Sequence, residues 1–125
     1  MARIRPTGTK PELLVFRFLR SEGIYFQKHY KGAVGRPDVA WPRKKLAVFI
    51  DGDFWHGYRF KEWKHKLPQG YWQAKIEANI KRDKRTFSSL RKNGWRVMRI
   101  WEHDLASKKR DKTFRKLLMF LDQSR

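Results

Sequence analysis

The predicted fold is organised around the stretch Leu46-Ala47-Val48-Phe49-Ile50-Asp51-Gly52-Asp53-Phe54-Trp55-His56. It begins with an uninterrupted apolar run, Leu46 to Ile50, which contains β-branched and aromatic residues and predicts a short strand buried on both faces. Two carboxylates, two aromatic residues and a histidine follow within a few positions. Because a buried strand is a rigid support, its end is a suitable place to fix reactive groups.

A second acid lies just upstream, in Gly35-Arg36-Pro37-Asp38-Val39-Ala40. We predict a strand over 37–41, a basic turn over 42–45 and then the buried strand, so that Asp38 and Asp51 stand at the strand ends that a hairpin brings together. Carboxylate oxygens suit a divalent cation, and the main-chain carbonyl of Ile50 is a further possible ligand. His56 can accept a proton from water near neutral pH. This spacing predicts a metal-dependent nuclease site, although acids near a strand end often only cap a turn.

The other elements follow from local signals. Thr9-Lys10-Pro11-Glu12 is a capping box that begins a helix ending at Gly23. Further along we expect a strand over 24–30, a loop over 57–70, a long amphipathic helix over 71–92, a strand over 95–101 and a final helix after a basic segment at 108–112. This order indicates one small α/β or α+β domain with a mixed central sheet.

Two acids on predicted helices each have two interpretations. Glu12 serves the helix cap alone, or it is also a carboxylate near the metal site. Asp83 falls on the inward stripe of the long helix, where an acid is costly to bury without a partner. It therefore forms a structural salt bridge to a basic side chain, or a hydrogen bond that orients His56.

The composition favours a polyanionic partner. The chain has 125 residues with 31 Lys plus Arg against 12 Asp plus Glu, and a net charge of +19. Nucleic acid is the leading partner, and we expect no membrane association because the basic residues run the full length rather than along one amphipathic helix. Contacts to phosphates are expected from Arg3 and Arg5, on a basic flexible arm over 1–8, and from Lys61, Lys64 and Lys66 in the loop, although a plain tail and a solvated loop are the alternatives.

The chain has no cysteine, no span long enough for a bilayer and no apolar leader, so we expect an intracellular protein.

Taken together, several motifs resemble the Vsr family of very-short-patch repair endonucleases and relatives with a Vsr-like nuclease core. The matching pieces occur in family order and span nearly the whole chain. They are 9–12, 35–38, 54–57, 71–72 with 75–76 and 79, 82–83, 94–97 and 101–102.

The resemblance implies a restriction-endonuclease-like fold over residues 9–125 and a magnesium site. Asp38 would be the metal-binding aspartate, His56 the catalytic histidine and Asp83 the acid that orients it, with Glu12 also at the site. Phe54 and Trp55 would match aromatic residues that wedge into the base stack beside a mismatch. Ordinary core packing is the alternative, and we expect it for one of these two aromatic residues.

The chain also departs from the repair enzymes. Asp51 stands where they have a histidine, and Asp53 where they have a zinc-binding cysteine. Tyr58, Phe60 and His103 occupy positions expected for the other zinc ligands, so we expect the structural zinc to be absent. Asp51 instead resembles related nuclease cores, and Asp53 is a further candidate metal ligand. These departures leave DNA cleavage as the expected activity without supporting T:G mismatch specificity.

The sequence therefore predicts a magnesium-dependent DNA endonuclease, acting as a monomer on double-stranded DNA and nicking one strand, at a mismatch or at a specific site. Two alternatives remain. One is a nucleic-acid-binding protein that kept the fold and lost catalysis, against which the intact set of acids argues. The other is an RNA-directed nuclease or binder, which charge alone does not exclude.

Overall fold

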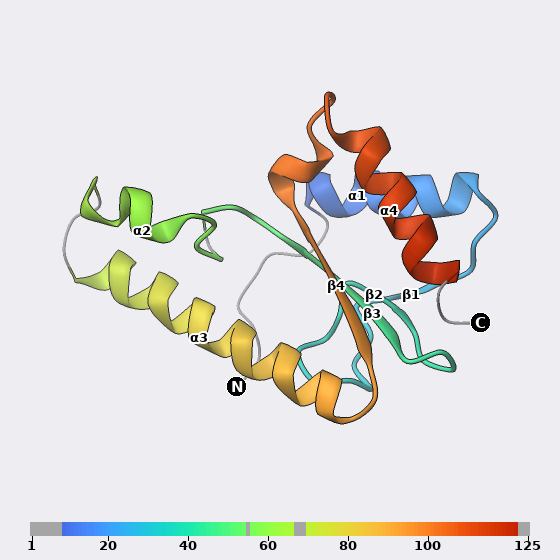
Figure 1. The fold of residues 1–125 in the computed structure, drawn as a ribbon, viewed down its shortest axis with the longest axis horizontal. Coiled ribbons are helices and arrows are strands. Elements are labelled where there is room, and N and C mark those ends of the chain that lie inside the picture. The colour runs from blue at the N-terminus through green and yellow to red at the C-terminus, as the bar shows by residue number, and fades with distance from the viewer. Residues whose placement is uncertain (1–8, 55, 67–69, 123–125) are drawn as a thin grey trace.

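The computed structural model describes residues 9–54, 56–66 and 70–122, which form a mixed sheet between helices (Figure 1). The sheet has four strands in the order β1-β2-β3-β4. Strand β2 is antiparallel to both of its neighbours, β1 and β3, whereas β3 and β4 are parallel. The strands are β1 (Gln27–Lys28), β2 (Val39–Trp41), β3 (Leu46–Asp51) and β4 (Arg96–Trp101). The mixed sheet predicted from the sequence is confirmed.

Strand β3 is the central element, and every residue of it is buried. Its side chains alternate between two apolar clusters because successive residues of a strand point to opposite faces. Val48 and Ile50 belong to one cluster, whereas Ala47 and Phe49 belong to the other. Asp51 follows the alternation of Ala47 and Phe49, so its carboxylate lies on their face of the sheet.

Helices cover both faces. Helices α1 (Lys10–Ser21) and α4 (Arg110–Asp122) lie on one side of the sheet, and α3 (Tyr71–Lys92) lies on the other (Figure 1). Side chains of α1 and α4 pack in the cluster that contains Val48, whereas Phe87 and Leu90 of α3 pack against Phe49. The bounds of α3 are those predicted from the sequence, 71–92. The parallel pairing of β3 with β4 requires a crossover between them, and α3 is part of it.

Helix α1 begins as its capping sequence predicts. The Thr9 side-chain oxygen accepts a hydrogen bond from the Glu12 backbone N–H at 3.5 Å. Proline in the first turn has no N–H that would need a partner there. Glu12 nevertheless has a fully buried side chain, so its carboxylate lies inside the protein and not on the surface of the helix.

Two predicted elements were wrong in extent. The strand expected over 24–30 is reduced to Gln27–Lys28, because Tyr25 is 82% exposed and its carbonyl accepts a hydrogen bond from Trp41 Nε1 at 2.7 Å. The loop expected over 57–70 contains α2 (Phe60–Trp63) and the short 3-10 helix η1 (Lys64–Lys66). Phe60 is buried with its ring edge-on to Trp63, and this local apolar contact supports the helical turn.

A second 3-10 helix, η2 (Glu102–Leu105), follows β4 and leads toward α4. No helix in the described part of the chain has the length and apolar character that a membrane-spanning segment requires.

Candidate active site

Three of the predicted site residues meet on the α3 side of the sheet. Asp51 at the end of β3, His56 in the following turn and Asp83 of α3 are at most 4% exposed. One ligand atom from each lies within 4.8 Å of those of the other two. Asp83 faces inward because it follows the helical stripe that buries Ile76 and Phe87. The structure thus brings Asp83, which is distant in the chain, to the carboxylate that ends β3 and the imidazole that follows it.

The imidazole of His56 has a fixed orientation. Its Nδ1 is 2.7 Å from Asp83 Oδ2, which is a hydrogen bond between two buried groups. Because a carboxylate only accepts, Nδ1 carries the proton and donates it. His56 Nε2 is directed toward Asp51 Oδ1 at 3.5 Å. A neutral Nε2 and a carboxylate oxygen are both acceptors, so a water molecule beside this pair could donate to each of them.

Arg99 of β4 completes this group. Its Nε donates to Asp51 Oδ2 at 2.8 Å and its Nη2 donates to Asp83 Oδ2 at 2.7 Å. Arg99 is the register partner of Phe49, and Asp51 lies two residues further along the same face of β3. A long side chain reaches such a diagonal neighbour. Both interpretations of Asp83 are therefore present in the structure, since it bonds His56 and also pairs with an arginine.

A second group forms around Asp38, just before β2. Ligand atoms of Glu12, His29 and Asp38 lie within 4.8 Å of one another, and both acids are fully buried. His29 Nε2 is 3.4 Å from Glu12 Oε2 and 4.0 Å from Asp38 Oδ1. The backbone N–H of His29 also donates to the carbonyl of Asp38 at 3.0 Å. The carboxylate of Glu12 thus faces the other acid of the site.

Strand β3 connects the two groups. Asp38 Oδ2 accepts a hydrogen bond from the backbone N–H of Ile50 at 2.7 Å, one residue before Asp51. In a strand, the N–H and C=O of one residue point toward the same neighbouring strand, so the carbonyl of Ile50 also faces the side of Asp38. Asp38 and Asp51 therefore flank the same end of β3, as the hairpin predicted, but each has a different set of partners.

Sequence reasoning missed His29 and Arg99. His29 adopts φ 47, in the left-handed region that non-glycine residues seldom occupy and that is often found at functional sites. Nothing local in the sequence indicates this. Arg99 could have been identified from the sequence, because it alternates with Trp95, Val97 and Trp101 on a largely apolar face of β4. A cation on such a face needs an acid as a partner.

Asp53 lies against the end of β4 and not against Asp38. Its Oδ1 is 2.8 Å from His103 Nδ1, and its backbone N–H donates to Glu102 Oε1 at 3.2 Å. The ring of Tyr58 packs 4.0 Å from that of His103. Asp53, Tyr58 and His103 stand at positions expected for zinc ligands, and a chain without cysteine does not fit a thiolate zinc site. Asp53 as a metal ligand stays a prediction.

An aromatic group lies beside the site. Phe54 is 41% exposed and stacks on Trp63 with ring centroids 5.4 Å apart, and Trp72 is 38% exposed and edge-on to Phe54. Phe54 is thus available at the surface, as intercalation would need. Trp55, Arg3 and Arg5, also predicted to contact DNA, lie outside the described residues.

The predicted basic contacts of the loop are now on α2 and η1. Lys61, Lys64 and Lys66 are all exposed. Lys64 also pairs with Glu77 of α3 at 2.9 Å. Their role in DNA binding stays a prediction.

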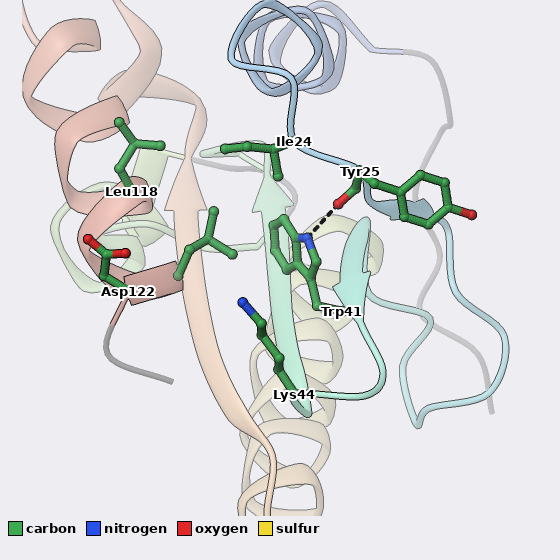
Figure 2. Close-up of a pocket in the computed structure, with 7 residues that line it drawn as sticks. Ile24, Tyr25, Trp41, Lys44, Leu118 and Asp122 are labelled. Carbon is green, nitrogen blue, oxygen red and sulfur yellow. Dashed lines mark hydrogen bonds between the residues drawn. The ribbon is translucent and has the colours of Figure 1, made fainter. Parts of the chain in front are cut away.

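A groove at the opposite end of β3 has different chemistry (Figure 2). Its volume is about 470 Å³, and Trp41 donates to the Tyr25 carbonyl beside it. It is lined by Ile24, Tyr25, Trp41, Lys44, Leu118, Leu121 and Asp122. Lys44 precedes β3 and Asp51 ends it, so about 20 Å of extended strand separates Lys44 from Asp51. With one carboxylate and no histidine in its lining, it does not resemble the site.

The described residues thus form a mixed sheet between helices, with buried groups of acids and histidines near the end of its central strand. The fold is similar to that of the catalytic domain of the homing endonuclease I-Bth0305I, with a TM-score of 0.66 over 94% of this chain and 98% of that one. At 23% sequence identity this similarity shows the fold alone. It confirms the fold class expected from the sequence.

Sequence comparison gives the family. The family model described as DNA mismatch endonuclease Vsr matches residues 1–63. The chain is 40% identical to the type II nicking enzyme V.HpaIIP of Haemophilus parainfluenzae over 100 residues, which cover 78% of this chain and 71% of that protein. It is 38% identical to V.XorIIP of Xanthomonas oryzae pv. oryzae, over 85% of this chain and 79% of that one. It is 31% identical to the DNA mismatch endonuclease Vsr of Escherichia coli, over 82% of this chain and 66% of that one. The chain belongs to the Vsr family of endonucleases, as its motifs predicted.

Proposed function

We propose that this chain is an endodeoxyribonuclease that uses a divalent cation to hydrolyse one phosphodiester bond and so nick one strand of double-stranded DNA. The observation that supports this most is the hydrogen bond from His56 to Asp83 beside Asp51, at the end of the central strand. The net charge of +19 suits a phosphate backbone. Several relatives are named as nicking enzymes and one as a mismatch endonuclease.

The donor set fits a hard divalent cation. Asp38, Asp51 and the Ile50 carbonyl offer oxygen atoms around one strand end, and magnesium prefers oxygen ligands. Glu12 and His29 would support Asp38 from the α1 side of the group. When bound, the cation would stabilise negative charge at the phosphate and increase the acidity of a water molecule.

The side chains of the chain itself perform the proton transfer. His56 Nε2 accepts a proton from the attacking water, since Nδ1 already holds the proton donated to Asp83. Asp83 keeps the imidazole in this tautomer and stabilises the positive charge that it acquires. Asp51 Oδ1, 3.5 Å from Nε2, lies close enough to Nε2 for the same water molecule to donate its other proton to it.

DNA binding uses surfaces outside the acid groups. One of Phe54 and Trp55 intercalates beside the cleaved bond, and Lys61, Lys64 and Lys66 contact phosphates. The arm over 1–8, with Arg3 and Arg5, contacts the backbone, and residues 9–125 form the nuclease domain. The protein acts inside the cell as a monomer.

Nicking of supercoiled plasmid DNA tests the proposal. The wild-type chain should convert supercoiled to open-circular DNA only with Mg²⁺, whereas Asp38→Asn and His56→Ala should not. Asp38→Asn keeps an oxygen that can accept from the Ile50 N–H, so the hairpin is retained. Asp111→Asn, on the exposed first turn of α4, is the matched control and should nick at the wild-type rate. Equal activity in all of the variants would refute the site.

The two alternatives have distinct outcomes. A binding protein without catalysis would retard duplex DNA in a salt-sensitive manner and leave the plasmid supercoiled at every metal concentration. An RNA-directed enzyme would be inhibited by duplex RNA far more than by duplex DNA of the same length. Comparing cleavage of duplexes with and without a T:G mismatch would then show whether the site that is cut must contain the mismatch.

A further inference from the structure

Arg99 bonds two acids of the site. Its guanidinium bridges Asp51 on β3 and Asp83 on α3, with donor-acceptor distances of 2.8 and 2.7 Å. The guanidinium carbon also lies 4.0 Å from the ring centroid of Trp101 and 5.1 Å from that of Phe87. Ring faces attract cations, so four groups from three elements hold this charge in one place.

The bridged oxygens are those that a cation in this group would need. Asp51 Oδ2 accepts from Arg99, and Asp83 Oδ2 accepts from both Arg99 and His56. Metal binding between Asp51 and Asp83 would require loss of these short bonds. It would also place a divalent ion close to a guanidinium that cannot lose its proton, and the two positive charges would repel each other.

The group around Asp38 offers a different environment for a cation. Its ligand atoms come from two fully buried carboxylates and from His29, whose side chain is 22% exposed. It also adjoins the Ile50 carbonyl, on the β2 side of β3. The two oxygens that Arg99 bonds belong to the other group, on Asp51 and Asp83.

We infer that Arg99 takes the place of a second cation, so that this site binds a single divalent ion, on the Asp38 side. Arg99 is then a positioning residue that neutralises Asp51 and Asp83 and keeps both oriented toward His56. The inference rests on the proposed function, because it concerns how the same site binds its metal.

Charge and shape make separate contributions, which two kinds of substitution distinguish. Arg99→Met and Arg99→Gln remove the charge while keeping an unbranched stem, and they remove the guanidinium that bonds Asp51 and Asp83. Arg99→Lys keeps the charge but lacks the planar fork that donates along two fixed directions. Lysine should therefore still exclude a second metal, while supporting nicking less well than arginine.

Counting bound Mn²⁺ by electron paramagnetic resonance titration tests the inference without relying on activity. The wild-type chain and Arg99→Lys should bind one Mn²⁺ per chain. Arg99→Met and Arg99→Gln should bind two, the additional ion being lost again when Asp83→Asn is combined with either. Circular dichroism shows which variants are folded. One folded variant of the two neutral ones, Arg99→Met and Arg99→Gln, is sufficient for the test.

Two results would overturn the inference. The first is two equivalents of Mn²⁺ on the wild-type chain. The second is a single equivalent on a folded neutral variant. If both neutral variants are unfolded, the wild-type and lysine stoichiometries decide, because either of them binding two ions contradicts exclusion by charge.

Failure of the proposed function has a different signature. In that case the wild-type chain would bind no Mn²⁺, Asp38→Asn would change nothing, and plasmid would remain supercoiled. The inference about Arg99 would then fall as well. If only the inference fails, metal-dependent nicking and its loss in Asp38→Asn persist, while the wild-type chain binds two ions or a folded neutral variant binds one.

Discussion

Replacing Asp83 with asparagine should slow nicking without removing the fold. Asp83 Oδ2 is 2.7 Å from His56 Nδ1, and both side chains are 3% exposed. Asparagine keeps the size of the side chain and an oxygen that can accept from Nδ1, but removes the negative charge. A hydrogen bond to a charged group contributes about 1.5–3 kcal/mol, and each ~1.36 kcal/mol of barrier changes the rate about tenfold. The expected decrease in kcat is therefore about 10- to 150-fold.

The assay should separate this effect from a loss of stability. Arg99 retains its 2.8 Å bond to Asp51 in the variant, so its charge is not left unpaired. The free energy of unfolding should therefore fall by less than the ~3 kcal/mol expected when a buried pair loses its partner outright. We expect a normal circular dichroism spectrum, a modest decrease in Tm and a slow single-turnover nicking rate with saturating Mg²⁺.

A double-mutant cycle tests whether Asp83 acts through His56. If Asp83 acts through His56, then adding Asp83→Asn to His56→Ala should change the residual rate by less than about twofold, because the residues function as a unit. An equal loss in both backgrounds would show that Asp83 acts independently of the histidine. Wild-type activity in Asp83→Asn would refute the role of the hydrogen bond altogether.

Three further predictions concern stability and DNA binding. Gly57→Ala should lower the free energy of unfolding by about 2–4 kcal/mol in urea denaturation, because φ is 73 and the new Cβ would lie 2.4 Å from a side-chain methyl of α3. Gly23→Ala, with φ 68 and nothing within 4 Å, should lose only the backbone part, and equal losses would contradict the packing explanation. Trp63→Leu should weaken duplex binding about 2- to 13-fold in fluorescence anisotropy with little change in single-turnover kcat, because Phe54 loses the ring on which it stacks; unchanged affinity would exclude this role. Lys61→Ala should make the slope of log affinity against log salt shallower by about 0.9, as expected for one lost phosphate contact, and an unchanged slope would remove Lys61 from the interface.

The local elements of the fold could be predicted because their causes are local. The apolar run of β3 specified a strand buried on both faces, and all of its residues are buried. The amphipathic period of α3 gave its bounds, and the threonine cap gave the start of α1. The segment over 57–70 was wrong because its basic residues conceal a short apolar contact between Phe60 and Trp63. One buried ring was enough to form a helical turn there.

The site was only partly predictable. Asp38 and Asp51 flank one strand end because a hairpin connects them, and hairpin geometry follows from the sequence. The hydrogen bond from His56 to Asp83 was one of two interpretations that the sequence left open, and the structure contains both. The family motifs indicated these residues as a set, whereas their distances and shared oxygens had to come from the structure.

The sequence alone determined the charge of the partner, the buried strand with its acids and histidine, and membership of a nuclease family, because composition, periodicity and motif order are properties of the chain itself. Only the tertiary structure decided which groups share an oxygen. Arg99 reaches Asp51 through the parallel register of β3 with β4, and Asp83 through the placement of α3 across that face. His29 reaches Glu12 through the packing of α1 against the sheet. Such contacts join residues that are far apart in the chain, and their geometry depends on strand register and helix packing, which no local pattern specifies.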